Sequence, residues 1–183
     1  MDALLIPKQP DSLYFVINRM WNGEAAPEQY HVEMWVNQSQ KGLVVRVHGI
    51  LLPNPRTPSG PRDKRTDELW NYDVAELFLV GEDGKYLEIE LGPSGHWLVL
   101  GFDGVRHRSN DYVAFNPDHR NSSLVAGTWQ SIITIPWDMV PTPLARLNAF
   151  AILDGQHLAL NPVPGKEPDF HQPQTYPEAR IAA

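Results

Sequence analysis

The sequence predicts an all-β fold: a single, mostly antiparallel β-sandwich of jelly-roll type with little helix. Short runs alternate apolar and polar residues with period two, and Gly, Pro, Asn or Asp interrupts them about every 8–12 residues. Almost no stretch shows the 3.6-residue period of an amphipathic helix. The 183 residues suit one domain, since a chain of about 150 residues or more buries enough surface for an apolar core.

The alternating runs predict strands rich in β-branched, aromatic and other apolar residues, each ended by turn-forming residues. In chain order they are expected at residues 13–18, 30–36, 43–50, 74–80, 85–91, 97–102, 111–115, 127–135 and 148–153. One short helical turn is expected after Pro136, because Pro141 and Pro143 would end a longer helix. Trp129 and Trp137 are expected to fill the core of the sandwich.

Two segments are rich in proline, and no change in composition marks a second domain within 1–183. We expect the core to span about residues 13–171, with a stiff loop over 53–68 and an extended C-terminal tail over 161–183. Loops of this length usually serve as lids or binding loops, or are disordered.

The composition excludes several classes of site. With no cysteine the chain has no disulfide, thiolate metal centre or thiol nucleophile. Its formal net charge of −7 argues against nucleic-acid binding, which depends on clustered Lys and Arg. The N-terminal residues lack a secretory leader, and no run approaches the roughly 20 apolar residues that cross a membrane. We therefore expect a soluble cytoplasmic protein with no membrane partner.

Two turns organise residues 74–102 into three adjacent strands. The Gly81–Lys85 stretch suits a three-residue hairpin loop with glycine in the left-handed conformation, and a second turn covers Gly92–Gly95. These turns predict the following cross-strand neighbours: Val80 with Tyr86, Phe78 with Glu88, Glu76 with Glu90, Glu90 with Trp97, and Glu88 with Val99.

Because side chains alternate across a strand, this pairing divides the block into two faces. One face is aliphatic and is expected in the core: Ala75, Leu77, Leu79, Leu87, Ile89, Leu91, Leu98, Leu100 and Phe102. The other mixes carboxylates with rings: Glu76, Phe78, Tyr86, Glu88, Glu90, Trp97 and Val99. Such a mixture is typical of a partly sheltered, polar concave surface.

The mixed face has three possible explanations. The carboxylates could be structural, paired with arginines of which Arg46 is a candidate. They could bind a sugar, whose C–H faces stack on aromatic rings while its hydroxyls donate to carboxylates. They could also be catalytic, because neighbouring carboxylates raise one another's pKa and acid/base pairs of glycosidases are built in this way.

A resemblance to a known family rests on residues 68–78, ELWNYDVAELF, and residues 86–95, YLEIELGPSG. These segments resemble the signature of a small uncharacterised family with animal and bacterial members, whose human member is named as an open reading frame on chromosome four. The similarity extends over roughly residues 20–171 and includes Pro136-Trp137 and the segment from Pro168 to His171.

The same block more loosely resembles family-9 carbohydrate-binding modules and their DOMON-like relatives. The matching positions are Asp73, Glu76, Tyr86, Glu88 and Glu90. The resemblance implies a jelly-roll-like sandwich with a sugar or small-ligand face; some relatives bind haem and some carry structural calcium. Such modules hold a sugar between two Trp rings. Trp70 lies where one ring could sit, and its partner stays open among Trp97, Trp129 and Trp137.

We expect no cofactor, although calcium is possible because of the density of carboxylates. The candidate metal ligands are Asp73, Glu76, Asp169 and His171.

The leading hypothesis is a non-catalytic module that binds a carbohydrate or polyol. Its candidate binding residues are Arg46, Trp70, Tyr72, Asp73, Glu76, Tyr86, Glu88, Glu90 and Trp97. One alternative is a glycan-acting hydrolase or lyase with acid and base drawn from Glu76, Glu88, Glu90 and His171. Another is a scaffold that contacts a protein partner through the proline-rich loop.

Overall fold

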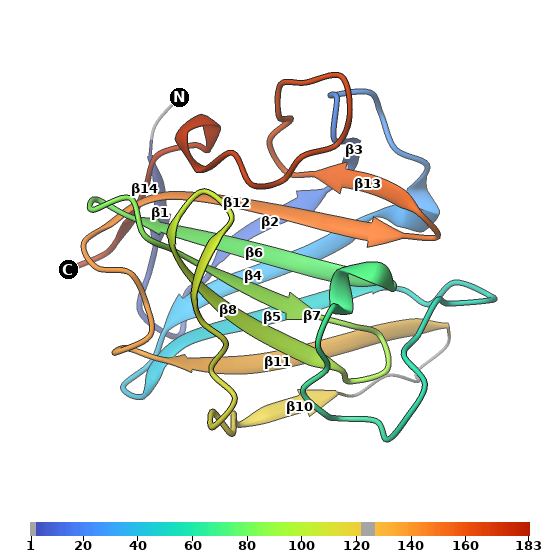
Figure 1. Ribbon diagram of the computed structural model, residues 1–183, viewed down its shortest axis with the longest axis horizontal. Coiled ribbons are helices and arrows are strands. Elements are labelled where there is room, and N and C mark those ends of the chain that lie inside the picture. The colour runs from blue at the N-terminus through green and yellow to red at the C-terminus, as the bar shows by residue number, and fades with distance from the viewer. Residues whose placement is uncertain (1–2, 122–126) are drawn as a thin grey trace.

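The computed structural model describes residues 3–121 and 127–183 and contains two large β-sheets packed in layers, with a small parallel sheet beside them (Figure 1). The seven-stranded sheet has the order β3 (Arg19–Met20), β13 (Gln156–Ala159), β12 (Leu144–Leu153), β6 (Val74–Gly81), β7 (Tyr86–Leu91), β8 (Trp97–Gly104) and β9 (His107–Asn110). The five-stranded sheet has the order β10 (His119–Asn121), β11 (Thr128–Pro136), β5 (Gly42–Ile50), β4 (Val32–Gln38) and β2 (Leu13–Ile17). The small sheet pairs β1 (Leu4–Ile6) with β14 (Ala179–Ile181).

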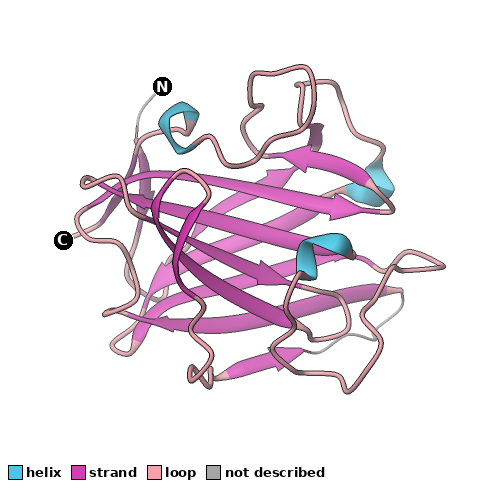
Figure 2. Cartoon of the chain, in the orientation of Figure 1, coloured by secondary structure: helices cyan, strands magenta, loops and turns pink. Residues whose placement is uncertain are grey.

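The all-β prediction is confirmed. Every pairing within the two large sheets is antiparallel. The helical elements in the described residues are three single 3₁₀ turns, η1 (Glu28–Tyr30), η2 (Leu69–Asn71) and η3 (Pro173–Thr175) (Figure 2). No helix in this described part of the chain is long and apolar enough to span a bilayer.

Most expected strands are present, with one correction. Residues 111–115 form a turn, closed by a hydrogen bond from the Phe115 N–H to the Tyr112 carbonyl, and not a strand. The strand β9 lies earlier because the chain reverses directly after β8 and pairs the residues next to that turn. The unexpected strands β1, β3, β10, β13 and β14 have two to four residues each, too few to show a period.

The seven-stranded sheet is covered on both faces. Its inner face packs on the five-stranded sheet around Met34, Leu77 and Trp129, which confirms Trp129 as a core residue. Its outer face carries a second apolar cluster that includes Phe78 and Phe150. The C-terminal segment that follows β13 covers this cluster and contributes the rings of Phe170 and Tyr176. As a result every residue of β6 and β7 is buried.

The predicted β6–β7 register is confirmed, including Glu76 opposite Glu90. The predicted β7–β8 register is wrong by one residue: Leu91, not Glu90, lies opposite Trp97. The connecting turn includes His96, whose carbonyl accepts a 2.8 Å hydrogen bond from the Gly92 N–H, so that it spans the five residues 92–96 and not the predicted four, 92–95. A one-residue shift moves every side chain of a strand to the other face.

The shift changes which β8 residues accompany the carboxylates. Trp97 and Val99 lie in the inner core. Leu98, Leu100 and Phe102, predicted for the inner core, lie on the outer face with the glutamates.

Replacement of Leu147 by Ala should lower the free energy of unfolding by about 2–5 kcal/mol, the usual cost of truncating a buried leucine. Leu147 is 0% exposed and lies on β12 in the inner core. Urea unfolding of the purified variant measures the change. Val113→Ala is the control, since Val113 is 75% exposed and its truncation should change stability by less than about 0.5 kcal/mol. Equal effects of both variants would contradict the described packing.

Candidate functional site

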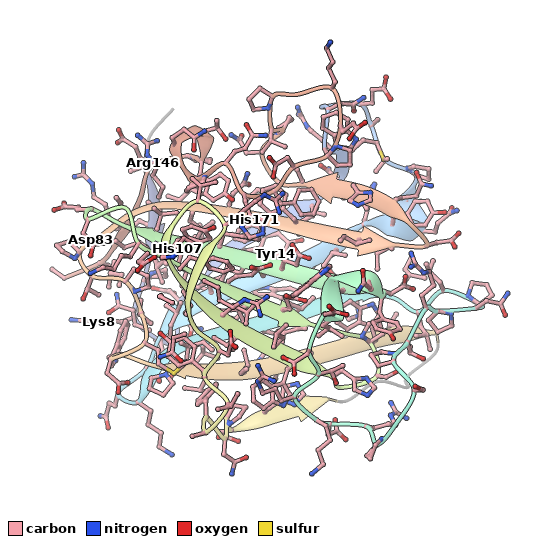
Figure 3. All side chains as sticks on the ribbon, in the orientation of Figure 1. Lys8, Tyr14, Asp83, His107, Arg146 and His171 are labelled. Atoms are coloured by element: carbon pink, nitrogen blue, oxygen red, sulfur yellow. The ribbon has the colours of Figure 1, made fainter. Side chains whose placement is uncertain are left out.

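A pocket of about 340 Å³ opens on the outer face of the seven-stranded sheet. Strands β6, β7 and β8 supply its floor, and η2, the β8–β9 hairpin and the C-terminal segment supply its walls. In Figure 1 the β8–β9 hairpin folds over this sheet, and Figure 3 shows His171 beside that hairpin. The lining residues are Trp70, Glu76, Glu88, Leu100, Phe102, Arg106, Arg108, Ile152, His157, Pro168, Phe170 and His171.

The floor contains three buried carboxyl groups. Glu76, Glu88 and Glu90 are 2%, 3% and 0% exposed. Burial raises the pKa of Glu88 to about 7, although Arg108 and Arg106 oppose the shift. Burial, with repulsion from Glu88, holds the pKa of Glu76 and of Glu90 well above the ordinary value of a glutamate. Burial therefore favours the protonated form of all three carboxyl groups.

Glu90 lies beneath the pocket, and both of its carboxyl oxygens lack a hydrogen-bond partner in the described part of the protein. A buried acceptor without a donor is unfavourable, and an ionised one is much more so. This burial, together with repulsion from Glu88 and Glu76, raises the pKa of Glu90.

The C-terminal wall is held by a hydrogen-bonded chain through Tyr86. The Tyr86 hydroxyl accepts a 3.0 Å hydrogen bond from the backbone N–H of Arg106 and lies 2.9 Å from His171 Nδ1. The other ring nitrogen of His171, Nε2, lies 3.9 Å from the Glu88 carboxyl. Burial lowers the pKa of His171 to about 4, with Arg106 and Arg108 adding to the effect. The ring is neutral at neutral pH.

Two arginines form the rim, and each is paired with an aspartate. Arg106 Nη2 is 2.7 Å from Asp169 Oδ1. The same oxygen accepts a hydrogen bond from the backbone N–H of His171. Arg108 Nη1 is 3.5 Å from Asp111 Oδ1, and its guanidinium lies 5.6 Å from the centre of the Trp70 ring. This cation–π contact orients the ring.

The structure brings together only part of the predicted set. Trp70, Glu76, Glu88 and His171 line the pocket. Glu90 and Tyr86 lie beneath it on β7. Asp169 lies at the rim, where its carboxylate pairs with Arg106.

The other candidates lie elsewhere. Trp97 faces the inner core. Arg46 is exposed on the outer face of the five-stranded sheet, whereas the carboxylates that it was expected to pair with belong to the other sheet. Tyr72 packs on the outer cluster without lining the pocket. Buried Asp73 joins two loops, since its carboxylate accepts the Arg56 and Asp154 N–H groups at 3.1 and 2.9 Å.

Among the described residues, no second tryptophan lines the pocket with Trp70. Trp97 and Trp129 belong to the inner core, and half-buried Trp137 donates its ring N–H to the Ser39 carbonyl. The other rings around the pocket are Phe102, His157, Phe170 and His171. Residues 3–121 and 127–183 contain no group of three His, Asp or Glu side chains that could hold a metal ion.

The sequence interpretation missed Arg106, Arg108, His157 and Phe170. Arg106 and Arg108 follow directly on the strand that neighbours the carboxylates. That adjacency was the available signal. His157 and Phe170 come from distant parts of the chain and left no local signal.

The chain is similar to a group of vertebrate proteins over most of its length. It is 32% identical over 169 residues to the mouse "UPF0462 protein C4orf33 homolog", covering 86% of each chain. It is 30% identical over 168 residues to the human "UPF0462 protein C4orf33", covering 86% of this chain and 82% of the human one. The sequence matches no protein-family model.

Two solved structures share the fold. One is a crystal structure of a proposed carbohydrate-binding protein from Bacteroides uniformis, with a TM-score of 0.70 and 14% identity over 92% of this chain and 86% of that one. The other is a family 9 carbohydrate-binding module from Caldicellulosiruptor kristjanssonii in complex with cellotriose, with a TM-score of 0.62 and 9% identity over 98% and 93%. The fold is thus that of family 9 carbohydrate-binding modules.

Glu90→Gln should weaken the pH dependence of stability above about pH 6.5. A carboxyl whose folded pKa is raised binds more protons in the folded state, so stability is full below the unfolded pKa and falls as pH rises. One such group contributes a slope of up to about 1.4 kcal/mol per pH unit. The opposite slope from the lowered pKa of His171 is confined to the interval from about 4 to 6.5.

Urea unfolding of wild type and Glu90→Gln at about pH 6.5 and 8.5 measures this slope. The wild type should lose more stability over the interval than the variant. Glu82→Gln, which removes an exposed carboxylate from the β6–β7 turn, is the control and should leave the slope unchanged. Parallel behaviour of wild type and Glu90→Gln would mean that Glu90 is not protonated at neutral pH.

Proposed function

We propose that this chain, which belongs to the UPF0462 (C4orf33) family, binds a saccharide or related polyol in the pocket on the outer face of its seven-stranded sheet, without catalysing a reaction. The observation that carries the proposal is the position of Trp70 beside the two buried carboxyl groups of Glu76 and Glu88 in one pocket. Each group supplies one of the two contacts that a sugar ring requires.

The apolar contact comes from the rings. A sugar presents C–H groups on the faces of its ring, and these pack on an aromatic surface. Trp70 offers the largest such surface, held in place by Arg108, and Phe102 and Phe170 add two further rings. Because these side chains are already packed, little conformational entropy is lost when a ligand binds.

The polar contacts come from the floor. A protonated carboxyl group has one O–H donor and further acceptor capacity, so it can bind a sugar hydroxyl in either direction. Burial favours this protonated form of Glu76, and Glu88, with a pKa of about 7, exists in both forms near neutrality. The neutral rings of His157 and His171 also line the pocket and each offers a donor and an acceptor.

The fold supports the same class of ligand. The solved structures that share it are described as a proposed carbohydrate-binding protein and as a carbohydrate-binding module bound to cellotriose. Since the sequence identities are only 14% and 9%, the shared fold favours saccharides as a class of ligand but does not identify one saccharide.

A glycan-acting hydrolase or lyase is the second candidate, favoured by the pKa of about 7 for Glu88 in the pocket. Such a pKa suits a general acid or base near neutral pH. Release of reducing sugar or of an unsaturated product from oligosaccharides, lost in Glu88→Gln, would replace the binding proposal with this one.

Trp70→Ala should weaken saccharide binding by about tenfold or more, which corresponds to about 1.4 kcal/mol for each factor of ten. Isothermal titration with glucose, cellotriose and other neutral oligosaccharides gives the dissociation constants. A thermal-shift screen finds the ligand first, because ligand at 100 times Kd adds about 2.7 kcal/mol to the stability of the native state.

Trp35→Ala is the matched control. Trp35 is a half-buried tryptophan on the outer face of the five-stranded sheet, stacked beside Tyr14. Its replacement should leave saccharide binding unchanged. Loss of binding in Trp35→Ala with retention in Trp70→Ala would move the site to the other sheet, and no binding of any saccharide by the wild type would contradict the proposed function.

A further inference from the structure

The three glutamates of the pocket floor occupy an unusual arrangement. Glu76 and Glu90 lie directly opposite each other across the β6–β7 ladder, and Glu88 is two residues from Glu90 on the same face. Opposed, buried carboxyl groups avoid mutual repulsion by holding a proton or by binding a cationic group. An arrangement that is unfavourable for the fold alone points to a role in binding.

The protein compensates these groups only in part, since Arg108 and Arg106 lower the pKa of Glu88 but leave it raised. Arg106 and Arg108 are the nearest guanidinium groups, and they pair with Asp169 and Asp111. Burial lowers the pKa of both histidines of the pocket, His157 and His171. The Nε2 of His171 stands 3.9 Å from the Glu88 carboxyl, beyond hydrogen-bond distance.

Within residues 3–121 and 127–183, no group donates a hydrogen bond to Glu90. Glu76 and Glu88 are also buried and reach the pocket. Their acceptor capacity is directed to whatever occupies it.

The surroundings select among possible occupants. A metal ion is disfavoured, because the described residues include no group of three side chains that could hold one. An ammonium group fits better: it has three donors and no acceptor, and aromatic faces such as those of Trp70 and Phe102 attract it. The formal net charge of −7 also favours the approach of a cation.

We propose that the saccharide bound in this pocket is an amino sugar, whose ammonium group donates hydrogen bonds to Glu88 and Glu76 while its ring packs on Trp70. The inference rests on the proposed function, since it names the class of saccharide for the same pocket. The paired arginines at the rim remain available to the ring hydroxyls, because each guanidinium has five N–H donors and one ion pair leaves several unused.

The test compares three sugars that share one ring and differ at one substituent. Glucosamine carries the ammonium group, N-acetylglucosamine carries a neutral amide at the same carbon, and glucose carries a hydroxyl. Isothermal titration of the wild type with each sugar and with its β-1,4-linked trimer should give at least about tenfold tighter binding for the ammonium form, the advantage of a charge-assisted contact in a sheltered site.

Glu88→Gln keeps the shape of the side chain and removes its charge. It should abolish the advantage of glucosamine over N-acetylglucosamine. Glu82→Gln, at the exposed β6–β7 turn, removes one carboxylate outside the pocket and should retain the advantage. The comparison of sugars on the wild type needs no variant, so it decides the question even if Glu88→Gln does not fold.

The outcomes separate the two proposals. If glucosamine binds no tighter than N-acetylglucosamine and glucose, the amino-sugar inference is overturned while the proposed function stands. Tighter binding of glucuronic acid than of glucosamine overturns it as well, because the rim arginines would then govern selection. If the wild type binds none of these sugars or their trimers, nor any other saccharide, both proposals fail.

Discussion

The burial of both faces of the seven-stranded sheet is the constraint on which the rest of the structure depends. The inner face is apolar and packs on the second sheet, as in any sandwich. The outer face is covered by the C-terminal segment and by the β8–β9 hairpin, and there the glutamates of β6 and β7 are removed from water. Covering this face converts an acidic surface into a pocket whose carboxyl groups have raised pKa values.

The hairpin turns show where sequence reasoning succeeds and where it fails. The Gly81–Lys85 loop has a recognisable turn chemistry, and the register that it predicts for β6 and β7 is correct. The turn after β7 contains Gly92, Pro93 and Gly95, which predict a turn but not the number of residues in it. One residue of difference moved Trp97 from the expected binding face into the inner core, so a small error in a loop became a large error in the candidate site.

The candidate site was predictable where one sheet builds it and not where distant segments meet. Glu76, Glu88 and Glu90 follow from the period of two strands and one turn, and Trp70 lies just before the first of those strands. Phe170 and His157 reach the pocket by tertiary packing over many intervening residues. The sequence also showed the glutamates as negative charges, whereas their ionisation depends on burial by the C-terminal segment.

The pairing of β1 with β14 has a consequence for how the pocket is formed. The segment that carries Phe170 and His171 is fixed at one end by β13 and at the other by β14, which is hydrogen-bonded to a strand from the beginning of the chain. The wall of the pocket is therefore a tethered strap and not a free tail. Its conformational entropy is lost when the protein folds and not when a ligand enters, so the cavity is preorganised at the expense of the unfolded state.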